Sequence, residues 1–247
     1  MRILAIDTAT WRCGVALVRD GVVVAERSER ATSNHAGILP RLVAETLEEG
    51  GRIGAGDAIA VTIGPGSFTG LRIALSFAKG LAFAGAYRLL GVPTLDALAL
   101  AAPEAEGRVC AVLDARKREV YAGLYERDAE GFHRRGAPCA IDAAGLAVAV
   151  GGPCAFVGDG VDVYGDVFRR VLGDGARLYA PATHPPSPIA VARLAAARLR
   201  RAPEGDDLAS LSPAYVRPPE AELSQSARSP SAGGRIQSFV DKVRIVY

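Results

Sequence analysis

The pattern of apolar and polar positions in the first hundred residues predicts an antiparallel meander followed by alternating helices and strands. The apolar runs are short and rich in β-branched residues, which is typical of strands, and Asp20-Gly21 favours a tight hairpin turn. Strands are predicted over residues 2–7, 13–19, 21–27 and 58–63, and helices over residues 34–49 and 71–85.

The two predicted helices differ in their apolar pattern. Residues 34–49 carry one apolar face, and Pro40 within them indicates a later start or a bend. Residues 71–85 are apolar or small on nearly every side, which is typical of a helix that is covered on several sides. The apolar positions include Ile38, Leu42 and Val43 in the first helix and Leu71, Leu75 and Phe77 in the second.

The second half of the chain repeats the beginning. The apolar run that ends in Asp7 returns as a second run that ends in Asp114, and each is followed by a polar turn and an alternating strand. The second half is also predicted to contain hairpin strands to about residue 137, a short helix near residues 142–149 and a strand over residues 155–157. A helix from Ser187-Pro188 to about residue 201 follows. The repetition predicts a duplicated α/β fold with lobes over residues 1–105 and 106–223.

The repeated carboxylates are candidates for a phosphate and Mg²⁺ site. Asp7 and Asp114 would hold the metal's water shell, while the Thr8 hydroxyl and the glycine turn at Gly158 and Gly160 would meet phosphoryl oxygens. The alternative is that both aspartates only accept hydrogen bonds in tight turns. Two copies in matching positions favour descent from a nucleotide-binding cleft.

The loop over residues 64–70, Gly-Pro-Gly-Ser-Phe-Thr-Gly, has two interpretations. Glycines before a helix allow a phosphate to approach the backbone and the helix N-terminus. The loop is neither a Walker A loop nor a dinucleotide fingerprint, because the required lysine and glycine spacings are missing. The same residues also suit a tight strand-to-helix turn capped by Ser67 or Thr69, and the sequence leaves both interpretations open.

Composition narrows the class of protein. With 49% hydrophobic and 23% charged residues, no apolar run of about 18 residues and no signal-peptide pattern, the chain is expected to be globular and cytoplasmic, without membrane contact. The four cysteines are expected to be reduced core residues. A net charge of +2 and short basic runs argue against tight nucleic-acid binding by this chain alone.

Two further features concern metals and the C-terminus. No two of His35, His133 and His184 lie within reach on one helix, so no metal-binding histidine pair is predicted. Residues 224–235 are rich in Ser, Gly, Pro and Arg, and residues 224–247 are expected to form a flexible tail. Residues 236–247 are nonetheless apolar enough to dock.

A set of short motifs, in order along the chain, resembles the TsaB (YeaZ) family. Each motif is weak alone, but the set covers residues 1 to about 223 and is specific as a whole. The resemblance implies an actin-like ATPase fold, related to Hsp70 and the sugar kinases. The motifs lie at residues 3–10, 35–40, 64–72, 78–81, 91–94, 114–116, 119–121, 158–160 with Tyr164, and 215–219.

The resemblance also implies a function and partners. TsaB proteins are non-catalytic subunits that act with the catalytic subunit TsaD and the ATPase TsaE to transfer a threonylcarbamoyl group to N6 of adenosine 37 in tRNAs reading codons that begin with A. The two helices named above would bind TsaD, or a second copy when TsaD is missing. The resemblance assigns no cofactor to this chain alone, and a nucleotide would bind, if anywhere, at the partner interface.

Two other functions compete with this one. An autonomous actin-like phosphotransferase, such as a small sugar or acid kinase, would need a complete ATP site, and the phosphate-binding elements are sparse. A metalloprotease would need the histidine pair that the sequence lacks.

Overall fold

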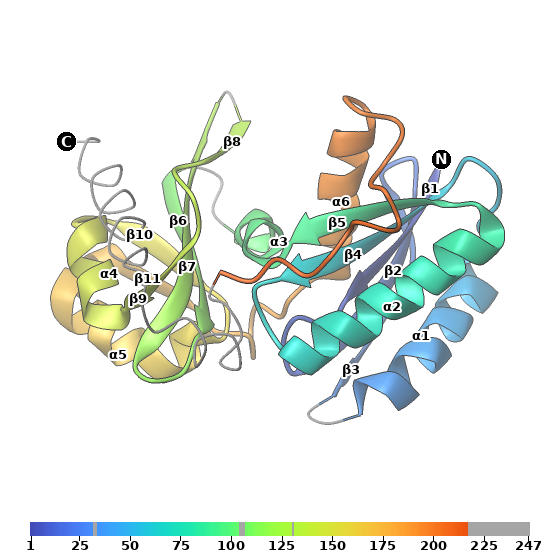
Figure 1. The fold of residues 1–247 in the computed structure, drawn as a ribbon. Coiled ribbons are helices and arrows are strands. Elements are labelled where there is room, and N and C mark those ends of the chain that lie inside the picture. The colour runs from blue at the N-terminus through green and yellow to red at the C-terminus, as the bar shows by residue number, and fades with distance from the viewer. Residues whose placement is uncertain (32–33, 104–106, 130, 217–247) are drawn as a thin grey trace. The chain divides into compact units, whose positions relative to one another are not determined.

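The computed structural model describes residues 1–31, 34–103, 107–129 and 131–216, which fold into two compact units. The first unit comprises Met1–Ala97 and Pro186–Ala214. The second unit begins at Leu98, runs to Pro185 and includes the last described residues, 215 and 216. Each unit is built around one mixed β-sheet (Figure 1).

The sheet of the first unit has the strand order β3–β2–β1–β4–β5. The central strand, β1 (Arg2–Asp7), is antiparallel to β2 (Arg12–Arg19) and parallel to β4 (Ala58–Gly64), which in turn is parallel to β5 (Arg88–Pro93). β3 (Val22–Arg30) pairs with β2 at the opposite edge. Because both faces of the central strands are covered, β1 and β4 are almost entirely apolar and buried.

Helices α1 (His35–Gly50) and α2 (Phe68–Gly85) lie side by side over one face of this sheet (Figure 1). Each begins at a side-chain cap, because the amide of Asn34 and the hydroxyl of Ser67 accept hydrogen bonds from backbone N–H groups three residues on, both at 3.2 Å. The two predicted helices are confirmed. α2 begins three residues earlier than expected, and α1 continues through Pro40.

The other face of the first sheet is covered by α6 (Pro188–Leu199), which packs against β1 and β2. Its first turn lies so close to β2 that a Cβ on Gly14 would be 3.1 Å from Cδ of Pro188. The sequence boundaries placed these residues in the second lobe, but the structure places α6 in the first unit. The order of elements along the chain did not reveal that the chain comes back to the first sheet after the second unit.

The sheet of the second unit has the order β11–β10–β6–β7–β8, with β9 also paired to β7. β6 is antiparallel to β7 and parallel to β10, so it repeats the relations of β1 to β2 and β4. The duplication predicted from the sequence is therefore confirmed. The strands are β6 (Gly107–Asp114), β7 (Glu119–Asp128), β8 (Gly131–Arg134), β9 (Cys139–Asp142), β10 (Cys154–Val157) and β11 (Ala176–Tyr179).

The helices of the second unit pack on its sheet around an aromatic pair. Phe156 of β10 and Phe168 of α5 (Gly160–Leu172) stack with ring centroids 4.3 Å apart, and α4 (Ala143–Val150) lies beside α5. A short 3₁₀ turn, η1 (Gly173–Gly175), leads from α5 into β11. α5 and β11 were not among the elements predicted from the sequence. The remaining helix, α3 (Thr94–Ala101), follows β5.

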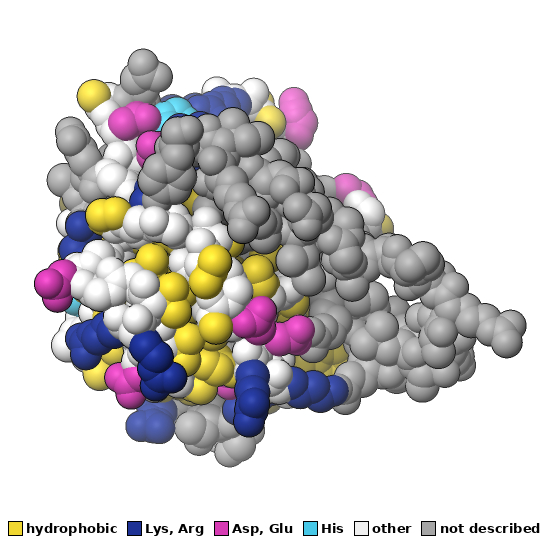
Figure 2. Space-filling view, turned by 90° about the vertical axis from the view of Figure 1, so that its left-hand side faces the viewer, with side chains coloured by type: hydrophobic (Ala, Val, Ile, Leu, Met, Phe, Trp, Pro, Cys, Tyr) yellow, Lys and Arg dark blue, Asp and Glu magenta, His cyan; other side chains and the backbone are white. Residues whose placement is uncertain are grey.

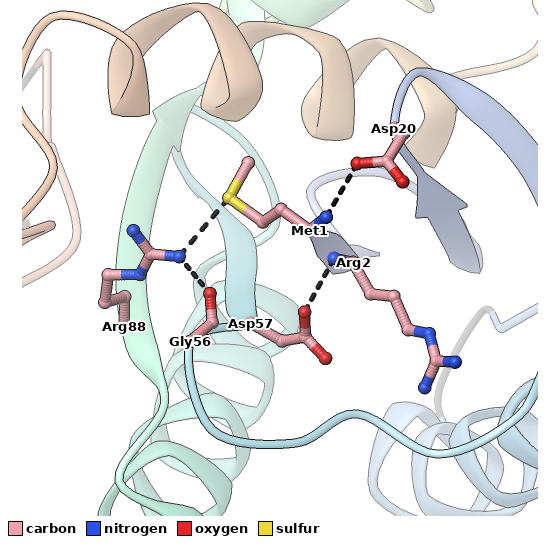
Figure 3. A network of polar contacts seen from close by, with 6 residues as sticks. All are labelled: Met1, Arg2, Asp20, Gly56, Asp57 and Arg88. Atoms are coloured by element: carbon pink, nitrogen blue, oxygen red, sulfur yellow. Dashed lines mark hydrogen bonds and ion pairs between the residues drawn. The ribbon is translucent and has the colours of Figure 1, made fainter.

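Polar contacts join the amino-terminal ends of three strands of the first sheet (Figure 3). The N-terminal amine pairs with Asp20 at 2.6 Å, and the backbone N–H of Arg2 donates to Asp57 at 2.7 Å. The guanidinium group of Arg88, at the start of β5, donates to the carbonyl oxygen of Gly56 and contacts the sulfur of Met1. These contacts tie together the amino-terminal ends of β1, β4 and β5.

Four further findings concern the predictions from composition. Cys13, Cys110, Cys139 and Cys154 are free thiols and all are buried, as expected of core residues. Burial raises the pKa of Cys13 and of Cys139 to about 12. Among the described residues, no helix is long and apolar enough to cross a membrane. The tail expected over residues 224–247 lies outside the described residues.

Candidate functional site

The carboxyl ends of β1, β4 and β5 meet at one edge of the first sheet, where Asp7 lies. One carboxylate oxygen of Asp7 accepts hydrogen bonds from the hydroxyl of Thr62, at the end of β4, and from the backbone N–H of Ala9, both at 3.0 Å. Burial raises the pKa of Asp7, while these two hydrogen bonds and nearby His35 act in the opposite direction. Asp7 is only 3% exposed, so this carboxylate faces its own fold.

The glycine loop packs directly against the turn that follows β1. The Thr8 hydroxyl is buried and donates to the carbonyl oxygen of Gly70 at 2.9 Å. The backbone N–H of Ser67 donates to the carbonyl oxygen of Ala9 at 2.7 Å. A Cβ at Gly66 or Gly70 would lie 2.3 Å from a carbonyl oxygen of this turn. These glycines are therefore needed for close packing of two backbone segments, as in the structural interpretation of the loop.

The groups at this edge of the sheet leave no room for a nucleotide phosphate. The backbone of the chain itself fills the space beside Gly66 and Gly70, and Asp7 and Thr8 already bond to Thr62 and to Gly70. No lysine stands in the Asp7 turn or the glycine loop. The donor set of the first unit therefore does not fit a phosphate group in this conformation.

Asp114 ends β6 in the second unit, at the position that Asp7 occupies in the first. It is more open than Asp7, with a side chain 15% exposed. Its carboxylate accepts hydrogen bonds from the Tyr164 hydroxyl at 3.2 Å and from the backbone N–H of Arg116 at 2.9 Å, and it pairs with the Arg116 guanidinium at 3.2 Å. The carboxylate is thus held by groups of its own unit.

Asp159 joins this cluster from the start of α5. Its carboxylate accepts a 2.9 Å hydrogen bond from the backbone N–H of Asp114. Burial raises the pKa of Asp159 to about 6, and the negative charges of Asp114 and Asp162 add to the effect. The predicted glycines beside it are structural. A Cβ on Gly158 would lie 2.2 Å from the carbonyl oxygen of Val112, and a Cβ on Gly160 would lie 3.1 Å from the same oxygen.

The turn after Asp114 has an unusual backbone. Arg116, Lys117 and Arg118 all have left-handed φ angles, of 63°, 53° and 65°, and all three are exposed. Such angles are strained for residues with a Cβ. The turn is closed by hydrogen bonds between Ala115 and Glu119 and between Glu119 and Arg116. The short basic run seen in the sequence is therefore a compact turn beside Asp114.

The three histidines occupy separate places in the fold. His35 is buried at the start of α1, with Nε2 3.2 Å from the carbonyl oxygen of Thr10. His133 pairs with Asp128 at 3.5 Å, and His184 packs edge-on against Tyr179. Within the described ranges, no group of three or more His, Cys, Asp or Glu side chains is arranged to hold a metal ion.

The residues predicted to form a partner interface differ in how far they are buried. Ile38, Leu42 and Val43 of α1 and Leu71 and Leu75 of α2 are at most 9% exposed and pack in the core between the helices and the sheet. Phe77 is half-buried against the same core. The first five side chains cover the chain's own sheet, whereas Phe77 stays partly accessible.

The outer sides of the same helices carry a different set of residues. Phe83 of α2 is 84% exposed, the highest value among the large hydrophobic residues described. A Cβ on Gly80 would meet nothing within 4 Å, so the backbone of α2 is openly accessible there. We give the name α1–α2 surface to seven of the exposed residues: Ala36, Pro40 and Ala44 of α1 and Arg72, Ser76, Gly80 and Phe83 of α2.

Sequence reasoning missed Thr62 and Asp159 as members of the two carboxylate clusters. Thr62 lies near the end of a buried apolar strand, just before the glycine loop, so its place at the carboxyl edge could have been predicted. Asp159 stands in the Gly-Asp-Gly turn that drew attention only for its glycines. Tyr164 and Arg116 were recognised as parts of motifs, and the structure shows that both hold Asp114.

Comparison with known proteins places the chain in a family. The family model described as TsaD, tRNA N6-adenosine threonylcarbamoyltransferase, matches residues 23–225. A Bacillus subtilis protein named tRNA threonylcarbamoyladenosine biosynthesis protein TsaB is 30% identical over 90% of this chain and 96% of its own length. The Escherichia coli protein of the same name is 42% identical over 53% of this chain and 58% of its own length.

A solved structure agrees with these sequence matches. A Pseudomonas aeruginosa protein described as similar to the peptidase YeaZ superposes with a TM-score of 0.75 and 32% identity, over 87% of this chain and 99% of that one. The duplicated sheets and flanking helices agree with the actin-like ATPase fold that the resemblance implies. This chain therefore belongs to the TsaB (YeaZ) family of tRNA threonylcarbamoyladenosine biosynthesis proteins.

Proposed function

We propose that this chain is a non-catalytic scaffold and activating subunit of a tRNA-modifying transferase. The complex would transfer a threonylcarbamoyl group to N6 of adenosine 37 in tRNAs that read codons beginning with A, and would work in the cytoplasm, where these tRNAs are used. Membership of the TsaB family supports the pathway. The modest net charge of +2 is consistent with tRNA contact made mainly through partners.

The lack of a catalytic role is supported by the groups that the chain has in place. No two of the three histidines are spaced to form a pair on one helix, and the ring of His35 hydrogen-bonds to the backbone of Thr10. Asp7, the carboxylate that an actin-like phosphotransferase would use, is buried and bonded to Thr62 and Ala9. The chain's own residues therefore favour a binding role over an autonomous kinase.

The observation that carries the proposal is the exposed α1–α2 surface. Phe83 projects from a helix whose opposite side is fully packed, and the small side chains around it leave room for another helix to pack closely. Exposed apolar surface of this kind typically marks a protein interface. We propose that a TsaD-type catalytic subunit binds here, and that a second copy of the chain binds when that subunit is missing.

The proposal includes two further partners or ligands. A TsaE-type ATPase would join the complex after the pair with the TsaD-type subunit has formed. Any nucleotide would bind at the interface with the partner, because the donor sets of the isolated units are occupied by internal contacts. Calorimetric titration of the chain alone with ATP and Mg²⁺ is expected to show no binding at micromolar concentrations.

The binding surface is tested with Phe83→Asp, measured by calorimetry against the TsaD-type subunit. An association of micromolar strength is worth about 8 kcal/mol, and a buried unpaired carboxylate costs several kcal/mol. Phe83→Asp is therefore expected to abolish capture of the subunit and self-association. The matched control is Val163→Asp on α5, because Val163 is also exposed and lies in the second unit.

The same two variants test the scaffold role in the reconstituted modification reaction. Phe83→Asp should stop formation of threonylcarbamoyladenosine together with complex assembly, whereas Val163→Asp should leave both unchanged. A folded Phe83→Asp chain that still supports assembly would show that the interface lies elsewhere. Modification by this chain without a TsaD-type subunit would overturn the non-catalytic assignment.

A further inference from the structure

The two repeats of the fold follow their first strand with different turns. After β1, residues 8–10 are at most 4% exposed, and the glycine loop packs against this turn. After β6, Arg116, Lys117 and Arg118 are all exposed, and the side chain of Arg116 is 86% exposed. The position that is buried in the first unit is therefore an open, positively charged turn in the second.

The backbone of this turn carries strain that glycine would avoid. Residues 116–118 have φ angles of 63°, 53° and 65°, which are unfavourable for any residue with a Cβ. The chain uses glycine for such angles at Gly21 in the β2–β3 hairpin and at Gly151 after α4. Among the described residues, five other than glycine have left-handed φ angles, and three of them stand in this turn. Strain kept at this position indicates that the side chains themselves are needed.

Hydrogen bonds hold the turn in this conformation. The backbone N–H of Ala115 donates to the carbonyl oxygen of Glu119 at 3.0 Å, and that of Glu119 donates to the carbonyl oxygen of Arg116 at 2.9 Å. The backbone N–H of Ala143, at the start of α4, donates to the carbonyl oxygen of Arg118 at 3.4 Å. Because the backbone is already fixed, less conformational entropy is lost when these side chains bind a ligand.

The charges around the turn favour an anion on its outer side. Asp114 pairs with Arg116 at 3.2 Å, and its side chain is only 15% exposed. Glu119, at the end of the turn, is half-buried. Asp142, which pairs with Glu119 across β7 and β9, is exposed but caps α4 by accepting a 2.8 Å hydrogen bond from the backbone of Gly145. The three adjacent cations are thus more exposed than most of the carboxylates beside them.

A phosphodiester backbone is the anion that suits this arrangement. Figure 2 shows Lys and Arg side chains on the lower part of the face that it views, the end of the second unit at which the β6–β7 turn lies in Figure 1. Guanidinium groups bind phosphate oxygens through paired N–H donors, and successive cations match the repeated charges of a nucleic-acid strand. An acidic protein segment fits less well, because the core of a protein interface is rich in apolar and aromatic side chains, and residues 116–118 offer only cations.

We propose, on the basis of the function proposed above, that residues 116–118 contact the phosphate backbone of the tRNA in the assembled complex, with Arg118 making one of the contacts. Three cations are too few for tight binding by this chain alone, in keeping with its net charge of +2. The turn belongs to the second unit and the α1–α2 surface to the first, so different residues serve the RNA and the TsaD-type subunit.

Arg118→Gly tests this proposal because it removes the cation and the strain together. The midpoint of urea unfolding should be unchanged or higher, since relief of the left-handed strain offsets the greater freedom of glycine in the unfolded chain. Binding of an unmodified tRNA transcript should weaken severalfold, and the slope of the logarithm of affinity against the logarithm of salt concentration should fall by about 1. Fluorescence anisotropy between about 0.05 and 0.2 M salt measures this on the complex of the full chain with the TsaD-type subunit.

Three further variants make the test specific. Lys117→Gly should also lower the salt slope, whereas Arg118→Lys keeps the charge and should keep the native slope. The matched control is Arg170→Ala, because Arg170 is exposed on α5 in the same unit and its loss changes the net charge by the same amount. Arg170→Ala should leave the tRNA affinity and the salt slope unchanged.

A complex whose tRNA affinity and salt slope do not respond to Arg118→Gly would overturn the proposal. An equal loss for Arg170→Ala would also overturn it, because the effect would then come from net charge. Weaker assembly of Arg118→Gly with the TsaD-type subunit, measured by calorimetry without tRNA, would assign the turn to a protein contact, and a lower urea midpoint would assign it to the fold. A native chain that does not assemble with the subunit would contradict the proposed function before any variant is compared, so the two failures are distinguishable.

Discussion

The hydroxyl of Thr62 donates a 3.0 Å hydrogen bond to the carboxylate of Asp7, which joins the ends of two parallel strands, β4 and β1. The same hydroxyl oxygen accepts a longer hydrogen bond, of 3.4 Å, from the backbone N–H of Thr8. All three residues are buried. In this chain the aspartate of the first repeat thus serves to hold the carboxyl edge of the sheet together.

Replacing Thr62 by Val should destabilise the chain by about 1–3 kcal/mol, because a buried carboxylate loses a donor. The loss should grow as the pH rises and Asp7 becomes charged, since the Thr62 hydrogen bond lowers the pKa of Asp7 and so favours its charged form. Urea unfolding over a series of pH values measures both effects. Thr69→Val, at an exposed position of α2, is the control and should change the free energy of unfolding little.

Much of the fold was predictable because the central strands are buried on both faces. The apolar runs that end in Asp7 and Asp114 revealed the duplication, since each run is long enough for one strand and stops at a carboxylate. Helix α5 was missed. Its inward spacing, Val161, Gly165 and Phe168, is regular, so periodicity alone would have been enough to predict this helix.

The candidate interface was less predictable, for a physical reason. Periodicity shows that Leu71 and Leu75 share a side of α2, but it does not show which side of an all-round apolar helix faces the sheet. That choice depends on the tertiary packing, which places Leu75 in the core and Phe83 in solvent. The return of α6 to the first sheet also depends on packing that the local sequence does not encode.

Leu75 and Phe83 should therefore respond in opposite ways to truncation. Leu75→Ala should cost about 2–5 kcal/mol of unfolding free energy, because Leu75 is 5% exposed and its loss leaves a cavity. Phe83→Ala should change stability by less than about 0.5 kcal/mol and weaken self-association. Urea unfolding and analytical ultracentrifugation measure the two quantities. A stable Leu75→Ala chain would contradict the core assignment of α2.

Asp159 should make stability depend on pH. Its folded-state pKa of about 6 lies above the ordinary value of 3.8, so the folded chain binds the proton more tightly than the unfolded chain. Its contribution to stability is therefore complete below about pH 4 and is lost as the pH rises to about 6. A shift of about two pH units corresponds to about 3 kcal/mol at most.

Asp159→Asn should remove this part of the pH dependence while keeping an oxygen to accept the hydrogen bond from the backbone of Asp114. Denaturant unfolding between pH 4 and pH 7 measures the difference between the native chain and the variant. Asp166→Asn, at an exposed position of the same helix, is the control and should keep the native slope. Identical slopes for the native chain and Asp159→Asn would show that Asp159 titrates normally.

Two glycines of α2 offer the sharpest test of how the glycine loop packs. A Cβ on Gly70, in the first turn of the helix, would lie 2.3 Å from the backbone oxygen of Thr8, whereas one on Gly80 would meet nothing within 4 Å. Gly70→Ala should therefore cost about 1–3 kcal/mol, because backbone must shift to admit the methyl group. Gly80→Ala should stabilise the chain by about 0.5–1 kcal/mol, because alanine restricts the unfolded chain and favours the helix.

Thermal and urea unfolding of the two variants provide the comparison, and each serves as the control for the other because both make the same chemical change in the same helix. The contrast depends on contact between the loop and the turn after β1, which also contains the 2.7 Å hydrogen bond from Ser67 to Ala9. If Gly70→Ala stabilised the chain as much as Gly80→Ala, the loop would stand away from that turn. The space would then be open to a ligand, and the phosphate-binding interpretation of this edge would regain support.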